Sequence, residues 1–252
     1  MNKAKFACLS LVLLPTLIAA QGKKPWQEWN AKEVDKVLNN SPWGQTQTDT
    51  DTSEMVYSPT SVGRSSIAAP STGRTGDQQS INNNRADRGA TNQAVSINYR
   101  IRLLSAKPIR QALARMVILQ QGKSDPGLRE QLSSFVDRDF NQFIVVAIAF
   151  DSTDGRFSGP ALQAFASATA GTLKNNTFLE RKDGKRLFLI DYKPPINDGL
   201  GAKFIFPRVV DGQPFLTPDS DNLRFSSQVS DKINLNMRYK LNDMTYDCKL
   251  EY

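Results

Sequence analysis

Beyond residue 20, the first apolar pattern in the chain is that of a short amphipathic helix. Within residues 21–43 one helical stripe, with Trp29 alongside it, is formed by Trp26, Asn30, Val34, Val37 and Leu38. Pro25 suits the first turn of a helix, and Ser41-Pro42 indicates its end. Because a helix of this length is not stable alone in water, it must dock on another surface. We expect it to dock on the body of its own chain, with a partner protein as the alternative.

Three tryptophans, Trp26, Trp29 and Trp43, mark this segment. If the segment docks on a partner, these side chains are its candidate binding residues. We therefore predict that residues 21–43 form a Trp-rich N-terminal helix that is tethered to the rest of the chain.

Residues 44–93 have a different composition, rich in Gly, Ser, Thr, Asn, Gln and Pro and poor in apolar residues. Such a segment buries too little apolar surface to offset the entropy lost on ordering. We predict a polar linker over 44–93 that is disordered from about residue 61 to residue 92. Residues 55–57, Met-Val-Tyr, have the composition of a short edge strand.

From residue 94 onward the patterns are those of a globular domain. Apolar and polar residues alternate over 95–103, which predicts a half-buried strand. Helical spacing predicts helices over 108–121 and 126–139, and Pro160 is expected to begin a third. The apolar run 143–150 is short and rich in β-branched residues, so it predicts a buried central strand.

The pattern of the last part of the chain predicts strands. Asp183-Gly184 and Asp211-Gly212 each lie between apolar runs, which is a strong hairpin signal. Perfect alternation over 233–241 predicts another strand. Cys248 shares the parity of the aromatic and apolar residues around it, so we expect it to be a small core residue on a final strand over 246–252.

These patterns together predict an α+β fold. We expect a single globular body over residues 94–252, with about three helices and a mostly antiparallel sheet of seven to nine strands. The tethered N-terminal helix and the disordered linker precede this body.

The first 20 residues have the pattern of a secretory signal peptide. Lys3 and Lys5 precede an apolar run, residues 6–20, that is too short to span a membrane and ends in small residues. We expect cleavage after Ala20, export to the periplasm or the exterior, and no transmembrane segment in the mature chain. Cleavage would remove Cys8 and leave Cys248 as the single cysteine.

The chain contains no histidine, which excludes several chemistries. Ser-His-Asp and Cys-His catalysis both need an imidazole base, and histidine-ligated zinc, iron and copper sites need imidazole ligands. We expect no cofactor and no metal site. Asp151/Asp154 and Asp219/Asp221 have the oxygen ligands of a weak calcium site, but such clusters are more typical of ordinary turns.

Carboxylates are the remaining catalytic residue type. Glu180 and Asp191 are predicted to lie on opposing arms of one hairpin, where their separation would suit the hydrolysis of glycans. Both carboxylates have basic neighbours, and cross-strand surface charges explain them equally well. We therefore expect no catalytic residue, and a histidine-free carboxylate hydrolase is the alternative.

The distribution of charge gives the best functional indication. No acidic residue occurs between Asp87 and Asp125, and Arg100 and Arg102 share one face of a predicted strand. This face could bind an anionic polymer, a lipid headgroup or an acidic protein. In the alternative, these arginines pair with acids elsewhere in the fold, such as Glu180, Asp137 or Asp139.

The sequence therefore favours an exported, non-enzymatic binding or assembly module of the cell envelope. An envelope protein or an anionic polymer is the expected partner. Nucleic acid is not expected, because no base-stacking motif accompanies the arginines. A polyanion-binding protein and the carboxylate hydrolase remain as alternatives.

Overall fold

The computed structural model describes residues 24–51, 95–122, 125–152 and 155–252. The predicted signal peptide, the strand over 55–57 and the disorder over 61–92 lie outside these residues.

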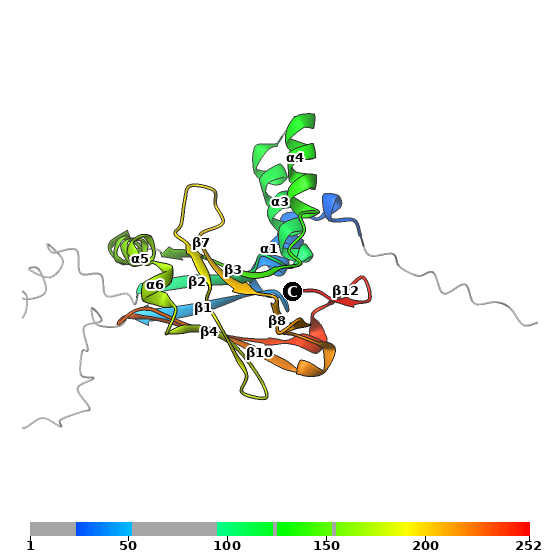
Figure 1. The fold of residues 1–252 in the computed structure, drawn as a ribbon. Helices are drawn as coiled ribbons and strands as arrows, with labels where there is room; N and C mark the ends of the chain where they lie inside the picture. The colour runs from blue at the N-terminus through cyan, green and yellow to red at the C-terminus, as the bar shows by residue number, and fades with distance from the viewer. Residues whose placement is uncertain (1–23, 52–94, 123–124, 153–154) are drawn as a thin grey trace, which may run out of the picture.

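A five-stranded antiparallel sheet forms the middle of the molecule (Figure 1). Its strand order is β1-β2-β3-β7-β6, and each pair of neighbours is antiparallel. The strands are β1 (Gly44–Asp51), β2 (Val95–Leu103), β3 (Phe143–Ser152), β7 (Ala202–Pro207) and β6 (Asp191–Lys193). The apolar run predicted as a central strand is β3, which has strands on both sides and is buried from Ile144 to Ile148.

A four-stranded antiparallel sheet packs on one face of this sheet. Its order is β11-β10-β4-β5, with β11 (Ile233–Lys240), β10 (Asn222–Ser230), β4 (Thr177–Arg181) and β5 (Arg186–Phe188). The inner faces of the two sheets form the larger hydrophobic core. Phe204 of β7 meets Phe225 of β10 edge-on, with 5.7 Å between ring centroids. Such aromatic pairs add to the free energy gained from burial.

Helices cover the opposite face of the five-stranded sheet (Figure 1). They are η1 (Trp26–Glu28), α1 (Ala31–Asn39), α3 (Lys107–Gln121) and α4 (Pro126–Val136). A second core, which we call the helix-layer core, joins α1, α3 and the sheet. Its buried residues are Val34, Leu38, Leu104, Ile109, Ala112, Leu113, Val145 and Ala147. The molecule therefore has three layers, helix, sheet and sheet.

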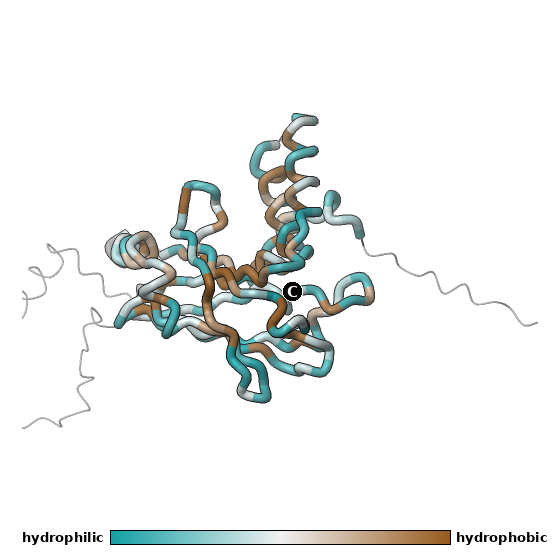
Figure 2. Tube along the Cα trace, in the orientation of Figure 1, coloured by the Kyte–Doolittle hydropathy of each residue, from teal (hydrophilic) through white to brown (hydrophobic). Residues whose placement is uncertain are grey.

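Smaller elements complete the fold. The helices α5 (Gly155–Ser167) and α6 (Ala170–Leu173) pack at one end of the two sheets, where Phe165 is fully buried. The other short elements are η2 (Pro218–Ser220), η3 (Leu241–Asp243), and the hairpins β8 (Val209–Val210)/β9 (Gln213–Pro214) and β12 (Thr245–Tyr246)/β13 (Lys249–Leu250). Figure 2 shows hydrophobic stretches where the sheets and α3 meet, and a hydrophilic tip on the β4–β5 hairpin.

The α+β class and the antiparallel architecture are those predicted from the sequence. The Asp183-Gly184 and Asp211-Gly212 turns also form as predicted, with Gly184, Asp211 and Gly212 all at positive φ. The described helices include none that is long and apolar enough to cross a membrane.

The predicted linker boundary is wrong at its beginning, because residues 44–51 form strand β1. The polar sequence GQTQTDTD gives no apolar alternation, yet β1 pairs with β2 along its whole length. Part of its stabilisation comes from side-chain amides. Gln47 Nε2 donates to the carbonyl of Asn234 at 2.8 Å, and Gln47 Oε1 accepts from the amide of Asn236 at 2.9 Å. Gln45 Nε2 likewise donates to the carbonyl of Arg238 at 3.0 Å, so these glutamines join the edge of β1 to the edge of β11.

Two further predictions are wrong in detail. Pro160 lies inside α5, which begins five residues earlier at Gly155. Cys248 is exposed and lies in the tight turn between β12 and β13, where Asp247 and Cys248 both have positive φ. Two consecutive left-handed residues are typical of a type I′ hairpin turn. The chain reverses there, so the alternating parity that predicted a buried cysteine does not continue through the turn.

Candidate functional site

Trp43 packs inside the body, at the junction of the helix layer and the sheets. It packs against both hydrophobic cores. Its indole Nε1 donates to the carbonyl of Glu251 at 2.8 Å, and its ring meets Tyr246 edge-on at 6.3 Å. These contacts tie the beginning of β1 to residues 246–251.

The rest of the Trp-rich segment docks on its own chain, as expected. The ring of Trp29 packs on the helix-layer core, and its carbonyl accepts a hydrogen bond from Arg115 Nε of α3 at 2.7 Å. Trp26 is half-buried within η1, which also contacts α3. Asn30 caps α1 in a capping box with Glu33, which fixes where this helix begins.

Arg102 does not contribute to a basic surface, because α1 covers it. The residue is only 5% exposed. Nε donates to the carbonyl of Leu38 at 3.1 Å, and Nη2 donates to Oδ1 of Asn39 at 2.8 Å. Burial lowers the pKa of the Arg102 guanidinium to about 10, so it stays charged at neutral pH. Arg102 thus provides a cation and two donors to the C-terminal end of α1, where carbonyl groups lack helical partners.

Arg100 is partly exposed but already paired. Its Nη2 lies 2.9 Å from Oδ1 of Asp151. Lys107 is paired in the same way with Asp137, at 2.8 Å. The predicted free basic face at Arg100 and Arg102 is therefore not formed, and the alternative of pairing with distant acids holds for Arg100 and Lys107.

The two candidate catalytic carboxylates do not face each other. The residue opposite Glu180 is Arg186, whereas Asp191 lies on β6 in the other sheet. The hydrogen bond from Arg186, with a second from Arg224, holds the pKa of Glu180 below its ordinary value of 4.5. Lys193 lowers the pKa of Asp191 in the same way. Neither group has the raised pKa of a general acid. Because the two carboxylates lie in different sheets, the prediction that they face each other on one hairpin is wrong.

The outer face of the four-stranded sheet carries a row of charged side chains. The register places Arg238 of β11 opposite Arg224 of β10, Arg224 opposite Glu180 of β4, and Glu180 opposite Arg186 of β5. Glu180 Oε2 accepts hydrogen bonds from Arg186 Nε at 2.6 Å and from Arg224 Nη2 at 3.0 Å. Two guanidinium groups therefore share one carboxylate, and we call Arg186, Glu180, Arg224 and Arg238 the arginine row.

Arg238 is the member of the arginine row that lacks an acidic partner within the described residues. Its neighbour across the strand pair is another arginine, and like charges directly opposite each other destabilise a sheet. Lys240, two residues further along β11 on the same face, also has no ion pair within the described residues. No described helix lies over this face (Figure 1).

Aromatic rings lie beside the arginine row. Phe178 and Phe188 are opposite each other on β4 and β5, with 6.0 Å between their ring centroids. The guanidinium of Arg186 lies over the Phe178 ring, 4.4 Å from its centroid. This stacking leaves the charge of Arg186 at the surface while holding its side chain in place.

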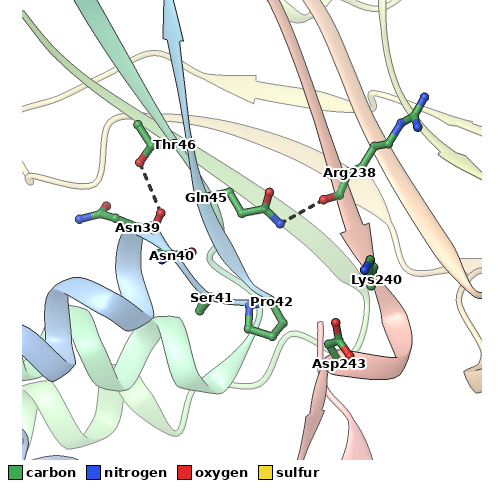
Figure 3. A pocket seen from close by; sticks show the side chains of 9 residues that line it. All are labelled: Asn39, Asn40, Ser41, Pro42, Gln45, Thr46, Arg238, Lys240 and Asp243. Atoms are coloured by element: carbon green, nitrogen blue, oxygen red, sulfur yellow. Dashed lines mark hydrogen bonds between the residues drawn. The ribbon is translucent and has the colours of Figure 1, made fainter.

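Two hollows open on either side of Arg238 and Lys240, which line both of them. One, of about 450 Å³, lies over β4 and β10 and is also lined by Glu180, Lys182, Asn222 and Arg224. The other, of about 570 Å³, lies between β11 and the corner where α1 leads into β1, and Figure 3 shows its lining. The basic pair, which we call the basic ridge, thus lies between the two hollows.

The two candidate calcium sites gain no support from the described residues. Asp151 is paired with Arg100, and Asp154 lies outside the described residues. Asp221 is paired with Lys182. The described part of the chain contains no group of three acidic, cysteine or histidine residues that could hold a metal ion.

Comparisons with known proteins give no family for this chain. No protein-family model matches it, and no curated protein matches it. Among solved structures, it is similar to the crystal structure of a novel protein of unknown function from Burkholderia pseudomallei. That similarity has a TM-score of 0.38 and 9% sequence identity, and covers 56% of this chain and 74% of the other.

Proposed function

We propose that this protein is an exported, non-enzymatic binding module of the cell envelope that holds an anionic polymer on the outer face of its four-stranded sheet. The observation that carries the proposal is the in-register pair Arg224 and Arg238 on an uncovered face. A like-charged pair costs stability, and a sequence retains such a cost where it serves a site. An anionic ligand would turn this repulsion into attraction.

The geometry of the face supports an extended ligand. Arg238 and Arg224 lie on the neighbouring strands β11 and β10, and Arg186 lies on β5, beyond the β4 strand that carries Glu180. Neighbouring strands are about 4.8 Å apart. The cations are thus presented in a line across the sheet. Lys240 widens the line at one end, and the two hollows extend it on either side of β11.

The first test is the removal of the unpaired cations. The double variant Arg238→Ala/Lys240→Ala is expected to weaken binding of heparin, a sulfated probe, about 30-fold in 0.1 M salt, at about 1 kcal/mol for each cation. The dependence of the logarithm of affinity on the logarithm of salt concentration should lose a slope of about two, because two fewer counterions are displaced. Fluorescence titration over a salt series measures both quantities.

The matched control removes two exposed lysines away from this face, Lys174→Ala/Lys249→Ala. It lowers the net charge by the same amount and should change the affinity less than about twofold if the site, rather than the overall charge, binds the polymer. Equal losses in the two double variants would refute the proposal.

A second test concerns the one carboxylate in the arginine row. Glu180→Gln removes the partner of Arg186 and Arg224, so we expect the affinity for heparin to rise about threefold in 0.1 M salt. The wild-type affinity should stay constant from pH 6 to pH 8, because the chain has no histidine and the lowered pKa keeps Glu180 ionised. Below pH 4.5, as the pH falls through that pKa, wild-type affinity should approach that of the variant. A change in wild-type affinity between pH 6 and pH 8 would contradict this assignment.

A further inference from the structure

The hollow between β11 and the α1–β1 corner differs in chemistry from the arginine row. Figure 3 shows Asn40, Ser41 and Pro42 on one side of it and Lys240 and Asp243 on the other, with Gln45 reaching across to β11. The guanidinium of Arg238 extends away from Gln45 (Figure 3), and the alternation along β11 places Arg238 on the outer face of the sheet. A ligand lying along the arginine row would therefore meet this hollow immediately beyond Arg238.

Some of the polar groups in the hollow are already used by the fold. Ser41 Oγ donates to the carbonyl of Val37 and accepts from the amides of Trp43 and Gly44. Asn39 accepts from Arg102 and donates to Asp35. These bonds make the α1–β1 corner rigid, so the remaining groups are presented in fixed positions.

Other groups in the hollow remain available. Within the described residues, the side chains of Asn40, Arg238, Lys240 and Asp243 take part in no hydrogen bond or ion pair. Asn40 offers an amide donor and an amide acceptor, Lys240 and Arg238 offer charged donors, and Asp243 offers a carboxylate that can only accept.

This combination favours one class of anionic polymer. A phosphate or sulfate ester group carries acceptors and no donor, so the carboxylate of Asp243 repels it. A sugar acid carries a carboxylate, which suits Arg238 and Lys240, together with hydroxyl groups that both donate and accept. Those hydroxyls suit Asp243 and Asn40.

We infer that the polymer bound by this protein is an acidic polysaccharide, and that Asp243 and Asn40 in the hollow form hydrogen bonds with its hydroxyl groups. The inference rests on the proposed function, since the basic ridge of Arg238 and Lys240 supplies the attraction. It adds that the ligand is a carboxylated glycan rather than a phosphate polymer.

The test compares two probes, an oligogalacturonate and a polyphosphate, with the variant Asp243→Asn. This substitution keeps the size of the side chain and removes its charge. Binding of polyphosphate should strengthen about twofold because a repelling charge is lost. Binding of oligogalacturonate should weaken about fivefold because a charged acceptor of a sugar hydroxyl is lost. The two affinities thus change in opposite directions.

The matched control is Asp231→Asn, an equivalent change at an exposed aspartate in the turn between β10 and β11. It should leave both affinities within about twofold of wild type and shift them in the same direction. Asn40→Ala provides a second readout, with a threefold loss expected for oligogalacturonate and none for polyphosphate.

Three outcomes separate the inference from the proposed function. Opposite shifts in Asp243→Asn, with like shifts in Asp231→Asn, support the glycan. If Asp243→Asn strengthens binding of both probes, the inference is overturned while the proposed polyanion site stands, provided that Arg238→Ala/Lys240→Ala weakens both. If that double variant binds both probes as wild type does, the proposed function and the inference fail together.

Discussion

Residues 94–252 expressed alone are expected to lack a cooperative unfolding transition. The sequence predicts that the body of the protein lies within these residues. In the structure, the body also includes two elements that precede residue 52, α1 and β1. Strand β1 pairs with β2 along its whole length, and α1 packs on α3 and the five-stranded sheet. Without them, one edge of the sheet loses its partner and the helix-layer core is opened.

The expected effect is large because several buried groups lose their environment together. Val34 and Leu38 are 3% and 2% exposed, and burying such a side chain contributes roughly 1.5–3 kcal/mol. Arg102 would lose both of its hydrogen-bond acceptors, and Trp43 would leave both cores. Their combined loss approaches or exceeds the roughly 5–15 kcal/mol that stabilises a typical domain.

Urea denaturation followed by circular dichroism measures this effect. Residues 24–252 are the control and should unfold in one cooperative transition. Adding a peptide of residues 24–51 to the fragment should restore part of the structure. A cooperative transition of the fragment alone, with the slope of the longer chain, would show that α1 and β1 are accessory to the body.

Arg102→Ala is expected to destabilise the protein by about 3 kcal/mol. The substitution leaves the carbonyl of Leu38 and the side chain of Asn39 without their donor, and an unsatisfied buried polar group costs about 1–3 kcal/mol. It also leaves a cavity where the buried arginine was, which adds to the cost. The end of α1 and the corner beside the 570 Å³ hollow should both loosen.

The matched control is Arg100→Ala, two residues earlier on the same face of β2. Arg100 is 40% exposed on its side chain, and its ion pair with Asp151 lies at the surface. Exposed ion pairs contribute roughly 0–1 kcal/mol, so this variant should unfold within that range of wild type. Equal losses of stability in the two variants, measured by urea denaturation, would contradict the different roles assigned to Arg100 and Arg102.

The sequence predicts the elements whose apolar residues recur with a clear period. The alternation over 233–241 corresponds to β11, the run 143–150 to β3, and the Asp-Gly pairs to hairpin turns. Strand β1 has no such period, since its pairing depends on β2 and on glutamine side chains that reach β11 from far away in the sequence. Composition alone therefore assigns it to the linker.

The candidate site illustrates why the distribution of charges along the sequence does not predict which charged side chains lie together on the surface. The acid-free stretch draws attention to Arg100 and Arg102, but α1 and Asp151 reach them through the fold. The arginine row is assembled from four strands, which belong to two strand pairs, β4/β5 and β10/β11, that are separated in sequence. One local signal did exist, because the alternation over 233–241 places Arg238 and Lys240 on the face opposite to the core.

The most direct test of the proposed site is footprinting of the arginines, by mass spectrometry with an arginine-selective reagent, on residues 24–252 with and without bound oligogalacturonate. The ligand should protect Arg186, Arg224 and Arg238 on the outer face of the four-stranded sheet. Arg100 and Arg129, on the side of the helix layer, should react equally with and without it. Protection of Arg100 or Arg129, with unchanged reactivity at Arg238, would place the ligand elsewhere and contradict the proposed site.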